Sequence, residues 1–165
     1  MMKKKVCLVG DFSVGKTSLT QQYVNQVFSE KYLTTVGVKI DTKEMLVNEK
    51  ELKMVIWDVA GRDALSPLNA NYLIGAAGFL LVIDGTRYET VESAQILIDT
   101  VLNKVGDIPF VVLVNKHDLQ DNWAFSTSDK EDFESRGWQV MTSSARTGEN
   151  VELAFESIAK RILGA

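Results

Sequence analysis

Short runs of apolar residues, set between polar and glycine-containing segments, predict the strands of a buried sheet. Residues 6–9, 79–83 and 110–114 are continuously apolar. Such runs are typical of parallel strands that are covered on both faces. Residues 138–142 form a further, less apolar run that predicts the last strand.

Two longer runs predict a β-hairpin. Residues 38–47 and 51–58 are strand-like and are joined by the polar residues 48–50. In the second run, apolar side chains occupy every second position from 52 to 56, so we expect one face of this strand to be more buried than the other.

Helices are predicted where apolar residues recur three or four positions apart. The first helix covers residues 18–24, and a long amphipathic helix covers residues 91–105. Shorter helices are expected at residues 65–74 and 129–136. The last helix covers residues 150–162, with an asparagine at its N-cap.

This alternation predicts an α/β fold. We expect three layers: a six-stranded, mostly parallel sheet with one antiparallel edge strand, and helices on both faces. The chain of 165 residues fits a single domain, and we assign residues 1–165 to it.

Composition and charge exclude several classes of function. The formal net charge of −4 argues against a general nucleic-acid binder. Cys7 is the only cysteine and His117 the only histidine, which leaves no disulfide and no zinc-binding cluster. No apolar stretch reaches the length of a membrane span, and the N-terminus lacks the apolar core of a signal peptide. We therefore expect a cytoplasmic protein.

The motif G-D-F-S-V-G-K-T, residues 10–17, lies between the first predicted strand and the first predicted helix. This is the pattern of a phosphate-binding loop, whose backbone N–H groups surround phosphate oxygens. Gly10 and Gly15 allow the backbone to approach the anion closely. Lys16 supplies charge for the outer phosphates, and Thr17 supplies an oxygen ligand of the kind that Mg²⁺ prefers. The alternative is a glycine-containing turn in an unrelated α/β fold.

Polar motifs also stand at the ends of other predicted strands. Asp58 follows the third strand, residues 115–118 follow the fifth, and Ser144 and Ala145 follow the sixth. Ligands of open α/β sheets bind beyond the carboxyl ends of the strands. We therefore expect these segments and the phosphate-binding loop to meet at one nucleotide.

Asp118 is expected to select the base. A carboxylate accepts two hydrogen bonds, which match the N1–H and 2-amino groups of guanine, whereas adenine has an acceptor at N1 and no 2-amino group. A buried polar group left unpaired costs about 1–3 kcal/mol, so adenine should bind roughly ten- to a hundredfold more weakly. The alternative is that Asn115 and Asp118 only cap the local backbone.

Five segments follow one another in the order of a known set of motifs. They are the phosphate-binding loop, Thr35, D-V-A-G at residues 58–61, N-K-H-D at residues 115–118 and S-A-R at residues 144–146. Over essentially its whole length the chain resembles the small GTPases of the Ras superfamily, closest to the Rab-like and Ras-like branches. The resemblance implies the P-loop NTPase fold and a Mg²⁺-dependent molecular switch that binds GTP and hydrolyses it to GDP.

The resemblance also implies roles for individual residues. Those implied in nucleotide binding are Ser13, Val14, Gly15, Lys16, Thr17, Ser18, Phe28, Tyr32, Asn115, Lys116, Asp118, Ser144, Ala145 and Arg146. The implied Mg²⁺ ligands are Thr17, Thr35 and, through water, Asp58. The implied catalytic set is Lys16, Thr35, Gly61 and Arg62.

The same family switches between two states with its nucleotide. Thr35 and Gly61 hold their loops only while a γ-phosphate is present, so hydrolysis releases both segments. Effector, exchange and activating proteins would bind through residues 34–39 and 62–73. We expect a monomer with no nucleic-acid partner and no membrane anchor in this chain.

Two residues depart from the family pattern. Arg62 stands where the family has a catalytic glutamine, and Phe12 stands where it usually has glycine or serine. Arginine has no acceptor for the attacking water. It either supplies charge to the transferring phosphoryl group or points to solvent. We therefore expect slow GTP hydrolysis. The alternatives are a non-hydrolysing guanine-nucleotide-binding scaffold and an adenine-nucleotide enzyme such as a small kinase, which Asp118 disfavours.

Overall fold

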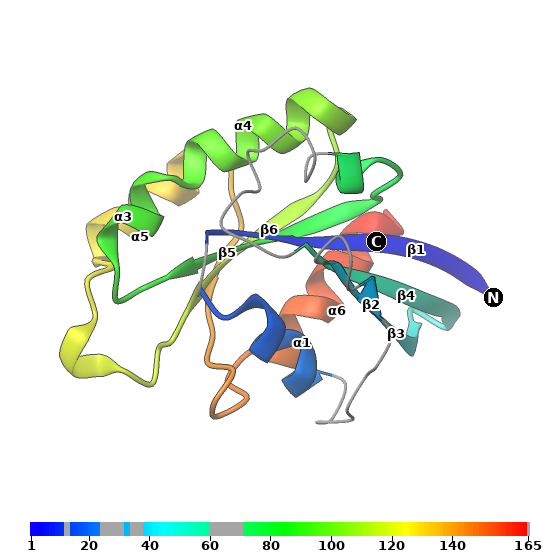
Figure 1. The fold of residues 1–165 in the computed structure, drawn as a ribbon, viewed down its shortest axis with the longest axis horizontal. Coiled ribbons are helices and arrows are strands. Elements are labelled where there is room, and N and C mark those ends of the chain that lie inside the picture. Colours follow the sequence, from blue (N-terminus) through cyan, green and yellow to red (C-terminus); the bar gives the residue numbers. More distant parts are fainter. Residues whose placement is uncertain (12–13, 24–31, 34–37, 60–70, 165) are drawn as a thin grey trace.

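The computed structural model describes residues 1–11, 14–23, 32–33, 38–59 and 71–164 of the chain. A central sheet carries helices on both of its faces (Figure 1). The three layers predicted from the alternation of strands and helices are confirmed.

The sheet has the strand order β2-β3-β4-β1-β5-β6-β7. Its strands are β1 Met2–Val9, β2 Tyr32–Leu33, β3 Val38–Val47, β4 Lys50–Val59, β5 Gly78–Asp84, β6 Phe110–Asn115 and β7 Val140–Thr142. β4, β1, β5, β6 and β7 are mutually parallel, whereas β3 is antiparallel to β4. All six expected strands are present, and the two-residue β2 adds to them at the edge beside β3.

Helices cover the sheet as two groups (Figure 1). The α-helices are α1 Lys16–Tyr23, α3 Tyr88–Glu92, α4 Ala94–Val105, α5 Thr127–Ser135 and α6 Val151–Ile162, with 3-10 turns η1 Asn71–Leu73 and η2 Gln120–Asn122. Helices α1 and α6 lie on one face, and α3, α4 and α5 lie on the other. Among the described helices, none combines the length and the apolar character that crossing a membrane requires.

Two apolar clusters fill the space between the sheet and these helices. On the α1–α6 face, the rings of Tyr23 and Phe155 stack with centroids 4.0 Å apart. On the opposite face, Phe79 stacks on Phe110 at 4.9 Å. All seven residues of β5 are buried, and residues 79–83 form the continuous apolar run that is typical of a strand between parallel neighbours.

The hairpin of β3 and β4 turns more tightly than expected. Val47 pairs directly with Lys50, so the connection is the two residues Asn48 and Glu49 rather than residues 48–50. Both have positive φ, 50° and 68°, as a two-residue turn that matches the strand twist requires.

Several helix boundaries differ from the predictions. The long helix is divided at Ser93 into α3 and α4. α5 begins at Thr127 instead of residue 129, because Ser126 and Asp129 form a reciprocal capping box. Asn150 occupies the N-cap of α6 as predicted. Its φ is 57°, however, and its Nδ2 donates to the Thr142 carbonyl instead of capping the helix.

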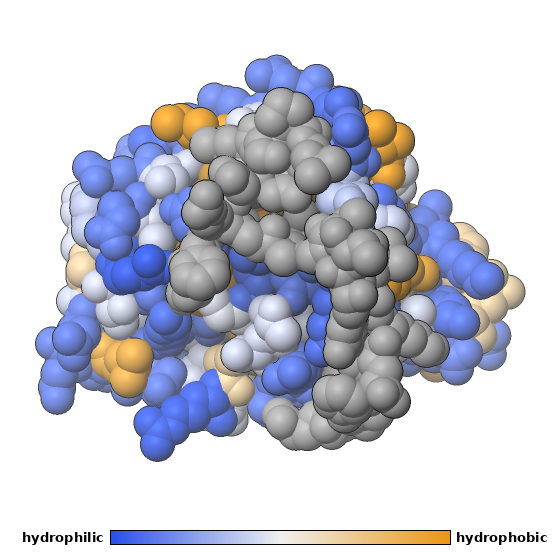
Figure 2. All heavy atoms as spheres, viewed as in Figure 1, coloured by the Kyte–Doolittle hydropathy of each residue, from blue (hydrophilic) through white to orange (hydrophobic). Residues whose placement is uncertain are grey.

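The face shown in Figure 2 is mainly hydrophilic outside the grey atoms, with hydrophobic side chains in small separate groups. Residues 65–70 of the predicted helix at residues 65–74 lie outside the described residues. The described remainder contains the 3-10 turn η1.

Candidate functional site

The phosphate-binding motif links the end of β1 to the start of α1. Its two glycines stand where no other residue fits. A Cβ on Gly10 would lie 2.4 Å from the Val82 carbonyl oxygen. Gly15 has φ +102°, and a Cβ there would lie 2.3 Å from the Asn115 Nδ2. Side-chain contacts under 3 Å are not tolerated, so this backbone path depends on glycine.

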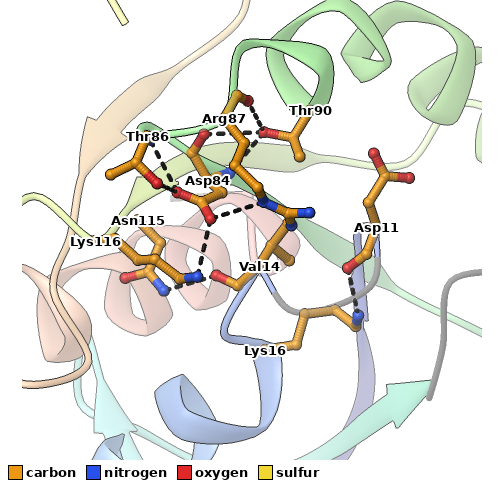
Figure 3. Close-up of polar contacts among 9 residues, drawn as sticks. All are labelled: Asp11, Val14, Lys16, Asp84, Thr86, Arg87, Thr90, Asn115 and Lys116. Atoms are coloured by element: carbon orange, nitrogen blue, oxygen red, sulfur yellow. Dashed lines mark hydrogen bonds and ion pairs between the residues drawn. The ribbon is translucent and has the colours of Figure 1, made fainter. Parts of the chain in front are cut away.

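Lys16 lies inside this loop and is 6% exposed. Its Nζ donates to the carbonyl oxygens of Gly10 at 3.2 Å and Asp11 at 3.3 Å. Figure 3 shows the side chain turned towards Asp11. Burial lowers the pKa of Lys16, and the charges of Asp58 and Asp11 oppose that shift. A buried ammonium with neutral hydrogen-bond partners favours an anionic ligand beside it.

Thr17 and Asp58 meet between α1 and β4. The Thr17 Oγ1 donates to the Asp58 Oδ2. Asp58 is 2% exposed, and burial raises its pKa against the opposing effects of the Thr17 hydrogen bond and the charge of Lys16. A hydroxyl and a carboxylate are hard oxygen donors, so this pair fits Mg²⁺. No cluster of three His, Cys, Asp or Glu side chains that would hold a metal occurs within the described residues.

Asn115, at the end of β6, joins the phosphate-binding loop to the base-binding motifs. It is 1% exposed, and its Nδ2 donates to the Val14 carbonyl at 2.9 Å (Figure 3). Its Oδ1 accepts from the Ser143 Oγ at 3.2 Å. The amide therefore holds β6, the segment after β7 and the phosphate-binding loop at fixed separations.

Asp84, at the end of β5, is the centre of a cluster of ion pairs and hydrogen bonds that was not predicted from the sequence. Its Oδ2 lies 2.9 Å from Lys116 Nζ and 3.0 Å from Arg87 Nε (Figure 3). Its Oδ1 accepts from the backbone N–H and the hydroxyl of Thr86, at 2.9 and 2.6 Å. Burial alone would raise the pKa of Asp84, but the hydrogen bonds of Thr86, Lys116 and Arg87 together lower it. A carboxylate at a strand end, the signal used for Asp58, was present in the sequence here too.

Asp118 lies beside the loop that follows β7. Its Oδ1 accepts from the Ser144 Oγ at 2.7 Å, and its Oδ2 lies 3.8 Å from an Arg146 Nη1. Its side chain is 15% exposed, whereas that of Arg146 is 81% exposed. The carboxylate is thus oriented by Ser144 and keeps access to the space between the two loops.

A cavity of about 410 Å³ joins these segments. It is lined by Gly15, Ser18, Gln21, Gln22, Asn115, Lys116, Asp118, Leu119, Ala145 and Arg146. Gln21, Gln22 and Leu119 were not predicted. Gln21 and Gln22 lie three and four positions after Ser18 in α1, and this helical spacing was the available signal.

The remaining predicted residues divide into two groups. Val14 and Ser144 are buried, Thr17 is exposed at the start of α1, and the backbone of Tyr32 lies in β2. Phe12, Ser13, Phe28, Thr35, Gly61 and Arg62 lie outside the described residues, as do residues 34–37 and 62–70 of the predicted partner segments.

Comparison with known proteins identifies the family. The family model described as Ras family matches residues 5–164. The chain therefore belongs to the Ras family. It is 39% identical over 166 residues to the Ras-related protein Rab7 of Drosophila melanogaster, which covers 96% of this chain and 80% of that protein. It is 36% identical over 167 residues to the Ypt/Rab-type GTPase ypt7 of Pyricularia oryzae, covering 96% and 82% of the two chains. Within the Ras superfamily this chain is thus a Rab-like small GTPase.

Proposed function

We propose that residues 1–165 form a single guanine-nucleotide-binding domain that acts as a Mg²⁺-dependent molecular switch, binding GTP and hydrolysing it slowly to GDP. One observation carries the proposal. Gly15 of the phosphate-binding motif and Ser18, the residue after that motif, line the same 410 Å³ cavity as Lys116, Asp118 and Ala145 of the base-binding motifs.

The phosphates would lie over the N-terminus of α1. Backbone N–H groups at this helix end and the buried Lys16 supply the donors and the charge that an anion needs. Val14 and Ser13 would complete the loop around the phosphates. Gly61 would donate its N–H to the γ-phosphate.

The base would lie between the two loops that follow β6 and β7. Asp118 would accept from the N1–H and 2-amino groups of guanine, and the Ala145 N–H would donate to the guanine O6. The stem of Lys116 would lie along one face of the ring, and Phe28 would contact its edge.

Thr17 and Thr35 would ligate Mg²⁺ directly, and Asp58 would hold it through water. When bound, Mg²⁺ neutralises developing charge on the phosphate oxygens. The contact of Thr17 with Asp58 supports this donor set.

Slow hydrolysis is proposed because Arg62 replaces the residue that orients the attacking water. A guanidinium has five donors and no acceptor, so it cannot take a hydrogen bond from that water. Phe12, where the family usually has glycine or serine, would add bulk near the same phosphate. Slow turnover would keep the GTP-bound form, and its partners at residues 34–39 and 62–73, engaged for longer. The domain is proposed to act as a monomer.

Two measurements test this proposal. The first is the nucleotide released from the purified protein by heat and separated by anion exchange, where guanine nucleotide is expected and adenine nucleotide would contradict it. The second is single-turnover GTP hydrolysis in wild type, Arg62→Gln and Phe12→Gly, where both variants should be faster.

The hydrolysis series also separates the alternatives. Fast wild-type turnover that collapses in Arg62→Ala would make Arg62 a built-in catalytic group. No turnover in any of these proteins, with guanine nucleotide bound, would identify a non-hydrolysing scaffold.

A further inference from the structure

The two base-binding loops are joined by one pair of side chains that the nucleotide motifs do not use. His117 lies in the loop after β6, and Glu149 lies just before α6. The His117 Nδ1 is 2.9 Å from both carboxylate oxygens of Glu149. The two side chains are 33% and 37% exposed, so the pair is partly shielded from solvent.

The imidazole also packs against an aromatic ring. Its ring meets Trp123 edge to face, with centroids 4.8 Å apart. Trp123 in turn lies against Gly85, where a Cβ would stand 2.2 Å from the indole ring. The Gly85 carbonyl also accepts from the N–H of Ala124 at 2.7 Å, which fixes the segment that carries the indole.

The carboxylate is oriented as well. The Glu149 Oε2 accepts from the Thr142 Oγ1 at 3.2 Å, and the Glu149 carbonyl accepts from the Ser144 N–H at 3.2 Å. A backbone bond from the His117 N–H to the Ser143 carbonyl, 3.0 Å long, runs between the same two loops. The side-chain pair and this backbone hydrogen bond therefore both bridge the two loops.

Each loop carries one of the groups proposed to read the base, Asp118 in the first and Ala145 in the second. Guanine can leave only if these two groups separate or the base slides out between them. We propose that His117 and Glu149 form a latch that holds the two base-binding loops together and slows the release of guanine nucleotide. This inference rests on the proposed function. His117 and Glu149 are positioning residues, because they act on the nucleotide through Asp118 and Ala145.

Within the described residues, Glu149 is the charged side chain that contacts the imidazole. The flanking Lys116 and Asp118 are directed elsewhere, to Asp84 and to Ser144 with Arg146. A hydrogen bond to a carboxylate is stronger than one between two neutral groups, so this contact suits a latch.

The test is the release of a fluorescent N-methylanthraniloyl-GDP from the Mg²⁺-loaded protein at pH 7, chased with excess GDP. Because the pair is about one-third exposed, we expect His117→Ala and Glu149→Gln to release the nucleotide about two- to fivefold faster than wild type. Glu131→Gln, at an exposed position of α5, is the matched charge control and should follow wild type.

A conservative variant separates positioning from mere structure. His117→Asn keeps an amide donor near the position of Nδ1, so its release of nucleotide should be slower than that of His117→Ala. Wild-type release rates in both His117→Ala and Glu149→Gln, or the same accelerated rate in His117→Asn and His117→Ala, would overturn the latch while leaving nucleotide binding intact. No binding of the labelled GDP by wild type would instead overturn the proposed function, and the latch with it.

Discussion

The ammonium of Lys116 lies 2.9 Å from the carboxylate of Asp84, which is 0% exposed at the end of the neighbouring strand. Lys116 has φ +69°, a left-handed conformation that a non-glycine residue adopts only where its surroundings hold it. The ion pair supplies such a constraint. It ties the base-binding loop after β6 to β5, so the position of this lysine depends on a residue outside the nucleotide-binding motifs.

Asp84→Asn should destabilise the protein and loosen its nucleotide site. The substitution removes the charge that Lys116 and Arg87 share, and leaves an amide among several donors. Because both cations are about one-third exposed, we expect a loss of about 2 kcal/mol in the free energy of unfolding. Urea unfolding of wild type and Asp84→Asn in excess GDP and Mg²⁺ measures this loss. Asp99→Asn, on the exposed side of α4, is the control and should change stability by less than about 0.5 kcal/mol.

The contribution of Asp84 should vanish in acid. Its pKa is lowered in the folded state, so its stabilising effect is fully present above the unfolded value of about 3.9 and is lost as pH falls through the lower folded value. The stability difference between wild type and Asp84→Asn should be constant from pH 7 to about 5 and shrink below about 4. A difference that stays constant down to pH 3 would show that charge is not its origin.

Gly15→Ala should damage the site more than a glycine substitution elsewhere. Its Cβ would meet the Asn115 Nδ2 at 2.3 Å, which breaks the hydrogen bond from that amide to Val14. The cost combines backbone strain with a lost buried hydrogen bond, about 2–4 kcal/mol in total. The midpoint temperature of thermal unfolding and the affinity for GDP should both fall.

Gly137→Ala is the matched comparison. Gly137 also has positive φ, +85°, but nothing lies within 4 Å of its added Cβ. Only backbone strain remains, about 1 kcal/mol, and GDP affinity should be unchanged. Equal losses in the two variants would mean that the contact with Asn115 does not matter.

The sheet was predictable because burial dictates its sequence. β5 and β6 are buried on both faces, and such strands read as unbroken apolar runs. The phosphate-binding motif was predictable for a similar reason, since the close contacts of Gly10 and Gly15 permit no side chain.

The cluster at Asp84 was not predictable in the same way. Its partner Lys116 comes from the adjacent strand end, and only the pairing of β5 with β6 brings the two together. Asn150 shows a related limit. Asparagine favours helix N-caps, but it also tolerates left-handed backbone, and the turn before α6 selects the second property.

Guanine recognition by Asp118 is tested most directly by the nucleotide specificity of wild type and Asp118→Asn. It is measured by competition of GDP, ADP and xanthosine diphosphate with labelled GDP for the binding site. Wild type should prefer GDP to ADP by at least about tenfold. In Asp118→Asn the amide would face the 2-amino group of guanine with a donor of its own, so the affinity for GDP should fall by about ten- to a hundredfold. The affinity for xanthosine diphosphate should rise, because its 2-oxo group accepts from that amide. An unchanged preference for GDP in Asp118→Asn would contradict the role of this carboxylate and the position assigned to the base.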